Sequence, residues 1–106
     1  MQTKPENDTD LRLKVNRETA RLPWTELLKH FAAGNVVWIA NSLDLVDVAV
    51  RISHDDKASI ASWMAAGLVA KASDLQAQTW TATDAHLWTA VVHPFVLVQP
   101  EKTSVH

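Results

Sequence analysis

Residues 35–49 read NVVWIANSLDLVDVA and contain two apolar patterns of different period. In the first pattern, five consecutive apolar residues, 36–40, lie between Asn35 and Asn41. Such an unalternating run, rich in β-branched residues, is typical of a strand that is covered on both faces. From Leu43 onward the apolar residues return at helical spacing. We therefore expect a buried strand followed by an amphipathic helix.

The helical pattern that begins at Leu43 continues to Ala66 and ends at Gly67. Its first part has an apolar stripe formed by Leu45, Val48, Ala49 and Ile52. A second stripe follows, formed by Ile60, Trp63 and Met64. Between the two, Ser53 is a candidate N-cap with acidic residues in the turn that follows it. The pattern does not decide between one kinked helix and two.

Two further helices are expected before this segment. Thr9 is a candidate N-cap for the first helix, whose apolar face is formed by Leu11, Val15, Thr19 and Leu22. Pro23 ends that helix and begins the next, since proline is favoured at the first helical position. The second helix closes at Gly34, and its apolar face is formed by Trp24, Leu27, Leu28 and Phe31.

The rest of the chain predicts a strand, a short helix and a β-rich end. The strand covers 68–72. Ser73 and Gln76 have the spacing of a capping box, which begins a helix that runs to about Thr81. Pro94 interrupts the β-rich segment 87–99, which therefore forms either two strands or one broken strand.

These patterns predict an α/β (α+β) fold, in which about four to five helices pack on a small mixed sheet of three to four strands, in the order ααβααβαββ. The length of 106 residues fits one compact soluble domain, which we place at residues 9–99. Residues 1–8 are expected to be a flexible N-terminal arm, and residues 100–106 a flexible C-terminal tail.

The composition argues against several classes of protein. Cysteine is absent, which excludes disulfides, thiolate nucleophiles and cysteine-based metal sites. The net charge is -2, whereas phosphate binding requires a clustered basic surface. The N-terminus lacks the apolar core of a secretory signal, and no apolar run approaches the length of about 18 residues that a membrane helix needs. We expect a cytoplasmic protein that binds neither nucleic acid nor membrane.

The residues that define these elements also resemble a known family. Those that carry the resemblance are Thr19-Ala20-Arg21, Pro23-Trp24, Glu26-Leu27, residues 43–49, Asp55-Asp56, Trp63 with Gly67, Ser73-Asp74, Gln76-Ala77, Trp80 and residues 96–99. Over about residues 11–99 the chain resembles a family of small bacterial proteins classified as a domain of unknown function, family 2288. No single motif among these residues is a catalytic signature. The resemblance implies a bacterial single-domain protein and no particular activity.

Three polar residues, Asp44, Asp47 and Arg51, share one face of the helix that begins near Leu43. In a functional interpretation they bind a hard cation or a small ligand, and Arg21 also binds a carboxylate or phosphate group of that ligand. In a structural interpretation Asp44 caps the helix and Asp47 pairs with Arg51 one turn later. The structural interpretation is the simpler one, because helix starts commonly have this pattern.

Other motifs for chemistry are absent from the sequence. Gly34 and Gly67 are the only glycines, so that phosphate loops and dinucleotide fingerprints cannot be built. The five histidines show none of the spacings of zinc sites. We therefore predict no metal, no cofactor and no catalytic residue.

Our leading functional prediction is a non-catalytic module that binds another protein or a second copy of itself, or that regulates a partner. It follows from the missing catalytic motifs and from five tryptophans, a residue type enriched at interfaces. Four of them are expected in the core: Trp24, Trp38, Trp63 and Trp88. Trp80 lies in a mostly polar helix and is the predicted partner contact. The alternative is a small-ligand-binding protein or an enzyme with a site around Asp44, Asp47 and Arg51.

Overall fold

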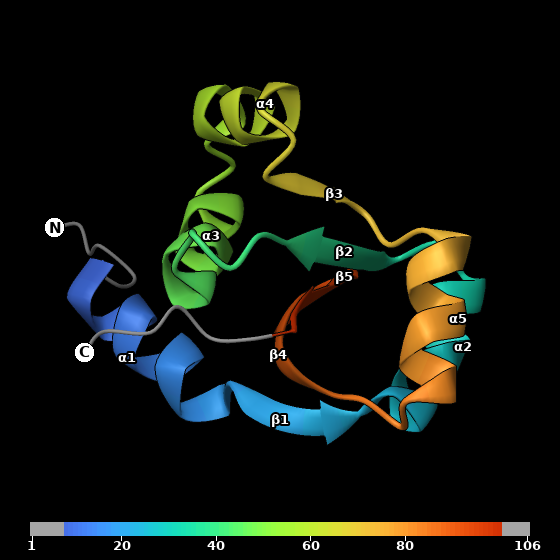
Figure 1. Cartoon of the computed structure of the whole chain (residues 1–106). Coiled ribbons are helices and arrows are strands. Elements are labelled where there is room, and N and C mark those ends of the chain that lie inside the picture. Colours follow the sequence, from blue (N-terminus) through green and yellow to red (C-terminus); the bar gives the residue numbers. More distant parts are fainter. Residues whose placement is uncertain (1–7, 101–106) are drawn as a thin grey trace, which may run out of the picture.

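The computed structural model describes residues 8–100 of the chain. They form a five-stranded mixed sheet with five α-helices and one 3-10 helix (Figure 1). In chain order the elements are α1 (Asp8–Glu18), β1 (Ala20–Pro23), η1 (Trp24–Leu27), α2 (Leu28–Ala32), β2 (Val36–Ile39), α3 (Leu45–Ser53), α4 (Lys57–Ala65), β3 (Val69–Lys71), α5 (Asp74–Ala82), β4 (His86–Val92) and β5 (Phe95–Gln99).

The strands follow one another across the sheet in the order β1-β4-β5-β2-β3. The pairing of β2 with β5 is parallel, and the other three pairings are antiparallel. Strands β1 and β3 are therefore the edges. The predicted α+β class with a mixed sheet is confirmed, whereas the predicted three to four strands and the order ααβααβαββ are wrong.

Strand β1 is the element missing from the expected order. Residues 20–23 were expected to end the first helix, but α1 ends at Glu18 and β1 pairs with β4. Proline has no N–H to donate to a neighbouring strand. An edge strand tolerates Pro23 because one of its sides has no neighbouring strand. The prediction of Thr9 as the N-cap is also wrong, because α1 already contains this residue.

The expected second helix is divided into η1 and α2. Trp24 and Leu27 of η1 are buried, whereas α2 has no fully buried residue. Gly34 follows α2 with φ +80°, a backbone conformation that favours glycine. The prediction that Gly34 closes this helical segment is confirmed.

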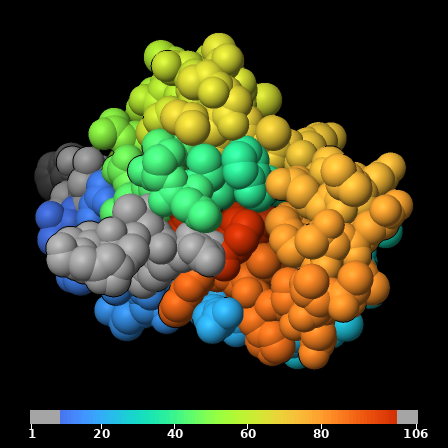
Figure 2. Space-filling model, viewed as in Figure 1, coloured from blue at the N-terminus to red at the C-terminus, as the bar shows by residue number. Residues whose placement is uncertain are grey.

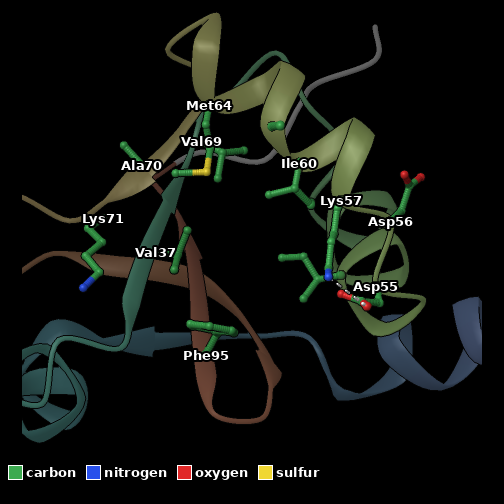
Figure 3. A pocket seen from close by; sticks show the side chains of 12 residues that line it. Val37, Asp55, Asp56, Lys57, Ile60, Met64, Val69, Ala70, Lys71 and Phe95 are labelled. Atoms are coloured by element: carbon green, nitrogen blue, oxygen red, sulfur yellow. Dashed lines mark ion pairs between the residues drawn. The ribbon is translucent and has the colours of Figure 1, made fainter.

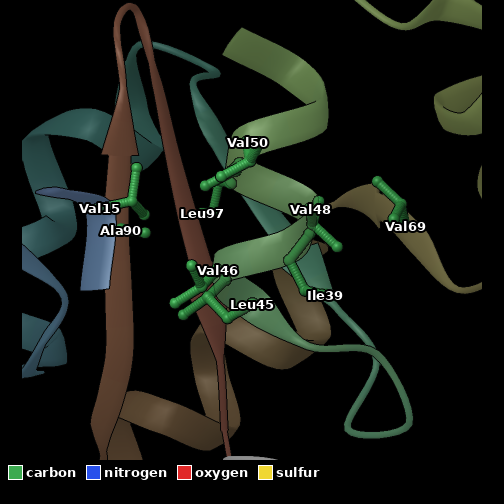
Figure 4. Close-up of a cluster of buried hydrophobic side chains, with 10 residues drawn as sticks. Val15, Ile39, Leu45, Val46, Val48, Val50, Val69, Ala90 and Leu97 are labelled. Atoms are coloured by element: carbon green, nitrogen blue, oxygen red, sulfur yellow. The ribbon is translucent and has the colours of Figure 1, made fainter. Parts of the chain in front are cut away.

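One face of the sheet carries a first hydrophobic cluster beneath α1 and α3 (Figure 4). Ile39 of β2 and Leu97 of β5 are fully buried there. Helix α3 begins beside them because Asp44 caps it, accepting a hydrogen bond from the N–H of Val46 at 3.0 Å. The strand and the amphipathic helix that residues 35–49 predict are confirmed. The buried members of the cluster are Val15, Ile39, Leu45, Val46, Val48, Ala49, Val50, Val69, Ala90 and Leu97.

The opposite face carries a second cluster, which η1, α2 and α5 cover. Trp24, only 1% exposed, packs edge-on against Trp80 with ring centroids 4.9 Å apart. Trp80 is itself 7% exposed, so the expectation that it lies outside the core is wrong. Helix α5 is mostly polar, but it turns its one buried residue into this cluster. Trp38, Trp63 and Trp88 are half-buried against the two clusters.

The remaining boundaries settle the alternatives that the sequence left open. Two separate helices follow β2: α3 ends at Ser53, and the N-cap of α4 is Asp56 rather than Ser53. The capping box of Ser73 and Gln76 at the start of α5 is confirmed. β4 and β5 are two separate strands on either side of Pro94.

The predicted arm 1–8 lies outside the described residues except for Asp8, which begins α1. The predicted tail 100–106 lies outside them except for Pro100. No helix within residues 8–100 has the length and apolar character that crossing a membrane requires.

Candidate functional site

Asp47 is the centre of the polar residues that the sequence singled out. Its Oδ1 accepts a hydrogen bond from Nη2 of Arg12 at 2.9 Å and lies 3.7 Å from Nε of Arg51. Arg12 belongs to α1, 35 positions earlier in the chain. The carboxylate of Asp47 therefore links α1 to α3.

Arg51 extends this contact to the start of α4. Its Nη1 lies 3.3 Å from Oδ2 of Asp56, the N-cap of that helix. Asp56 also accepts hydrogen bonds from the hydroxyl of Ser59 at 2.8 Å and from the Ser59 N–H at 3.2 Å. These two bonds from Ser59, with a smaller contribution from Arg51, hold the pKa of Asp56 below the ordinary value for aspartate.

Arg12, Asp47, Arg51 and Asp56 form what we call the ionic network. Three of its members, Arg12, Arg51 and Asp56, line a cavity of ≈ 370 Å³ together with Val50 and His54. Two guanidinium groups face two carboxylates, so the network is balanced in charge without a ligand. This geometry favours the structural interpretation, in which the network joins three helices.

The other two predicted polar residues do not join the network. The side chain of Asp44 is used in capping α3. Arg21 lies in the edge strand β1, opposite Trp88, and within residues 8–100 no ion pair joins it to Asp44 or Asp47. Arg12 takes the place that was expected for Arg21. Among the described residues, no group of three or more His, Cys, Asp and Glu side chains could hold a metal ion.

A second site, which we call the α4 groove, lies between α4 and the sheet (Figure 3). Its volume is ≈ 410 Å³. Its apolar lining comprises Val37, Ile52, Ile60, Ala61, Met64, Val69, Ala70 and Phe95. Its charged lining comprises Asp55, Asp56, Lys57 and Lys71.

The α4 groove exists because α4 lies at the β3 edge of the sheet and does not cover the central strands. Helix α3 packs over β4 and β5, whereas α4 contacts α3 and β3. Asp55, with φ 56°, turns the chain between the two helices. No residue of α4 is fully buried, although its sequence KASIASWMA is largely apolar. In the space-filling view α4 protrudes as a ridge at one end of the molecule (Figure 2).

The apolar side chains of the groove are unusually accessible. Met64 of α4 is 55% exposed, and Phe95 at the start of β5 is 38% exposed. Val37 is half-buried on the floor, on the same face of the sheet as Val69. Exposed apolar surface that gathers in a concave site marks binding sites in soluble proteins.

Comparison with known proteins places the chain in a family. The family model described as Protein of unknown function (DUF2288) matches residues 10–100. The chain belongs to the DUF2288 family. The resemblance that the sequence motifs carry is thereby confirmed.

A solved structure supports the fold of this DUF2288 protein. The NMR solution structure of PA1075 from Pseudomonas aeruginosa is similar to it, with a TM-score of 0.78 and 33% sequence identity. The match covers 100% of both chains. No functionally curated protein matches the chain.

The sequence of this DUF2288 protein predicts part of the ionic network but not the α4 groove. Asp47 and Arg51 stand one helical turn apart, which sequence spacing reveals. Arg12 of the ionic network lies far along the chain from Asp47, and no local pattern connects the two. The same is true of Val37 and Phe95, which line the α4 groove from different strands. The one available signal was the stripe of Ile60 and Met64, which was interpreted as core.

Proposed function

We propose that this DUF2288 protein is a non-catalytic binding module whose α4 groove accepts an apolar ligand group. The observation that carries the proposal is the groove itself: a concave site of ≈ 410 Å³ with eight apolar residues among the twelve that line it. Small-molecule sites are concave, largely apolar and about 300–1,000 Å³ in volume. The groove has this size and this lining.

The chemistry of the lining supports binding rather than a nucleophilic reaction. The twelve residues include no Ser, Thr or His, so that no hydroxyl lies beside an imidazole in the groove. Both of its carboxylates are engaged in ion pairs: Asp55 with Lys57 at 4.0 Å and Asp56 with Arg51 at 3.3 Å. Contact with these side chains would hold a ligand without a covalent step.

The proposal moves the binding site away from the polar residues of the sequence-based alternative. The charge of Asp47 is already compensated by Arg12 and Arg51. Met64 and Phe95, in contrast, leave apolar surface exposed. The sequence predicts a protein partner or a second copy at Trp80, which is buried; we propose the protruding face of α4 for this contact instead, because no residue of this helix is fully buried. Light scattering during gel filtration tests that prediction.

The experiment for the α4 groove uses an uncharged apolar probe, 1-octanol, and two matched variants. Met64→Asp places a carboxylate in the groove, and Leu13→Asp places one on α1 at a residue of equal exposure, 55%. We expect the wild type and Leu13→Asp to bind octanol with similar affinity and Met64→Asp to bind at least about tenfold more weakly, since an apolar ligand would have to desolvate a charge. Circular dichroism verifies that both variants are folded. Equal affinity of the two variants, or no binding by the wild type, would overturn the proposal.

A further inference from the structure

Of the charged side chains in the α4 groove, Lys71 is the one that the described residues leave uncompensated. Lys57 lies 4.0 Å from Asp55, and Asp56 lies 3.3 Å from Arg51. Within residues 8–100, no carboxylate lies within ion-pairing distance of the Lys71 ammonium, and no hydrogen bond engages it. The groove therefore has one cation that can attract a ligand of opposite charge.

Lys71 stands at one end of the apolar floor. It lies opposite Val37 in the antiparallel pairing of β3 with β2, and opposed side chains project from the same face of a sheet. Its ammonium reaches toward the turn between α2 and β2, where a β-carbon on Gly34 would lie 3.9 Å from Nζ. Figure 3 shows Lys71 to one side of Val37 and Phe95, with Ile60 and Lys57 across the groove.

We infer that the ligand of the α4 groove is an apolar monocarboxylate, with its chain on Val37, Ile60 and Phe95 and its carboxylate at Lys71. The inference rests on the proposed function of the groove and adds the charge of the ligand to it. A carboxylate that lies next to apolar side chains is unfavourable because it loses contact with water. An ammonium at the end of the apolar surface offsets this cost by pairing with the carboxylate. Because Lys71 is exposed, the ion pair adds a modest preference to binding that the apolar contacts provide.

The test compares octanoate with 1-octanol, which have the same chain length and differ in charge at pH 7. Binding of each to the full chain is followed by NMR titration of the side-chain methyl groups, at low ionic strength and below the concentration at which octanoate forms micelles. We expect the wild type to bind octanoate about 1.5- to fivefold more tightly than octanol, the range of an exposed ion pair. Added salt should reduce this preference because it screens exposed charges.

Three variants assign the preference to Lys71. Lys71→Met should lose the preference for octanoate, and Lys71→Glu should prefer octanol. Lys57→Met is the matched control, since it removes the other cation of the groove, which Asp55 already compensates. This variant should keep the preference for octanoate.

The outcomes separate this inference from the proposed function. Equal binding of octanol and octanoate by the wild type would overturn the inference and leave the apolar groove standing as the site. Loss of the preference in Lys57→Met as large as in Lys71→Met would also overturn the assignment to Lys71. If neither probe binds the wild type, the proposed function fails together with the inference.

Discussion

Lys71 and Val37 lie directly opposite each other in β3 and β2, so that a cationic and an apolar side chain stand side by side on one face of the sheet. Lysine on an edge strand also discourages pairing with other chains. This protective role explains the charge of Lys71 but leaves the apolar groove beside it unexplained. The ligand binding that we propose accounts for both features.

The packing of the first cluster predicts a large loss of stability when Leu97 is shortened. Leu97→Ala removes a fully buried side chain from β5, and we expect the free energy of unfolding to fall by about 2–5 kcal/mol. Denaturant unfolding followed by tryptophan fluorescence measures this loss. Leu75→Ala, at a residue that is 72% exposed, is the control and should change the free energy by less than about 0.5 kcal/mol.

The buried amide of Gln99 predicts a difference between two substitutions. Its Nε2 donates to the carbonyl oxygens of Ala40 and Leu43, each at 2.8 Å, and so ties β5 to the loop between β2 and α3. Gln99→Leu removes both donors and should cost about 1–3 kcal/mol of the free energy of unfolding. Gln99→Glu should cost more at pH 7, because a buried carboxylate would face those carbonyl oxygens. Chemical unfolding of both variants decides the order, and a Gln99→Glu protein as stable as the wild type would contradict this role.

The ionic network predicts a measurable coupling between Arg12 and Asp47. We expect a double-mutant cycle of Arg12→Gln and Asp47→Asn to give a coupling free energy of about 0.2–1 kcal/mol, reduced by salt. The same cycle on Asp55 and Lys57, whose charged atoms lie 4.0 Å apart, is the matched control with the longer contact. A coupling no larger than that of the control would mean that the Arg12 contact does not hold α1 to α3.

The lowered pKa of Asp56 predicts a dependence of stability on pH. A carboxylate whose pKa is lower in the folded than in the unfolded chain stabilises the fold above the unfolded value, near pH 3.9, and this contribution is lost as the pH falls through the folded value. The stability difference between the wild type and Asp56→Asn should therefore be constant from pH 7 to about pH 5 and shrink below about pH 4. Urea unfolding across this range measures it. Asp84→Asn, in the exposed turn before β4, is the control for the type of substitution. A stability difference between the wild type and Asp56→Asn that stays constant down to pH 2.5 would contradict the lowered pKa.

The sequence predicted those elements whose patterns are local. Residues 35–49 specify a strand and a capped helix through a change of hydrophobic period, and Ser73 with Gln76 specifies the start of α5. Strand β1 escaped prediction because its partner, β4, lies more than 60 positions further along the chain. Periodicity could not reveal that an edge strand had formed.

The candidate site was harder to predict than the fold, for a related reason. Apolar spacing identifies Ile60 and Met64 as one helix face, but it does not show whether that face meets a covering layer. In the structure α4 contacts α3 and the edge strand β3, and it leaves the α4 groove open over the neighbouring part of the sheet. The opposite holds for Trp80: the polar sequence of α5 predicts an exposed side chain, but Trp80 is buried. A helix with a mostly polar sequence can still direct one large aromatic side chain into the core.

The most direct test of the α4 groove is a methyl-detected NMR titration of the wild-type protein with 1-octanol. We expect saturable shift changes confined to methyl groups that line the groove, among them those of Val37, Ile60, Met64 and Val69, while the methyl groups of Leu13 and Leu75 on exposed surfaces elsewhere stay unchanged. Shift changes spread equally over Leu13 and Leu75, or none at the groove residues up to the solubility limit of octanol, would contradict it.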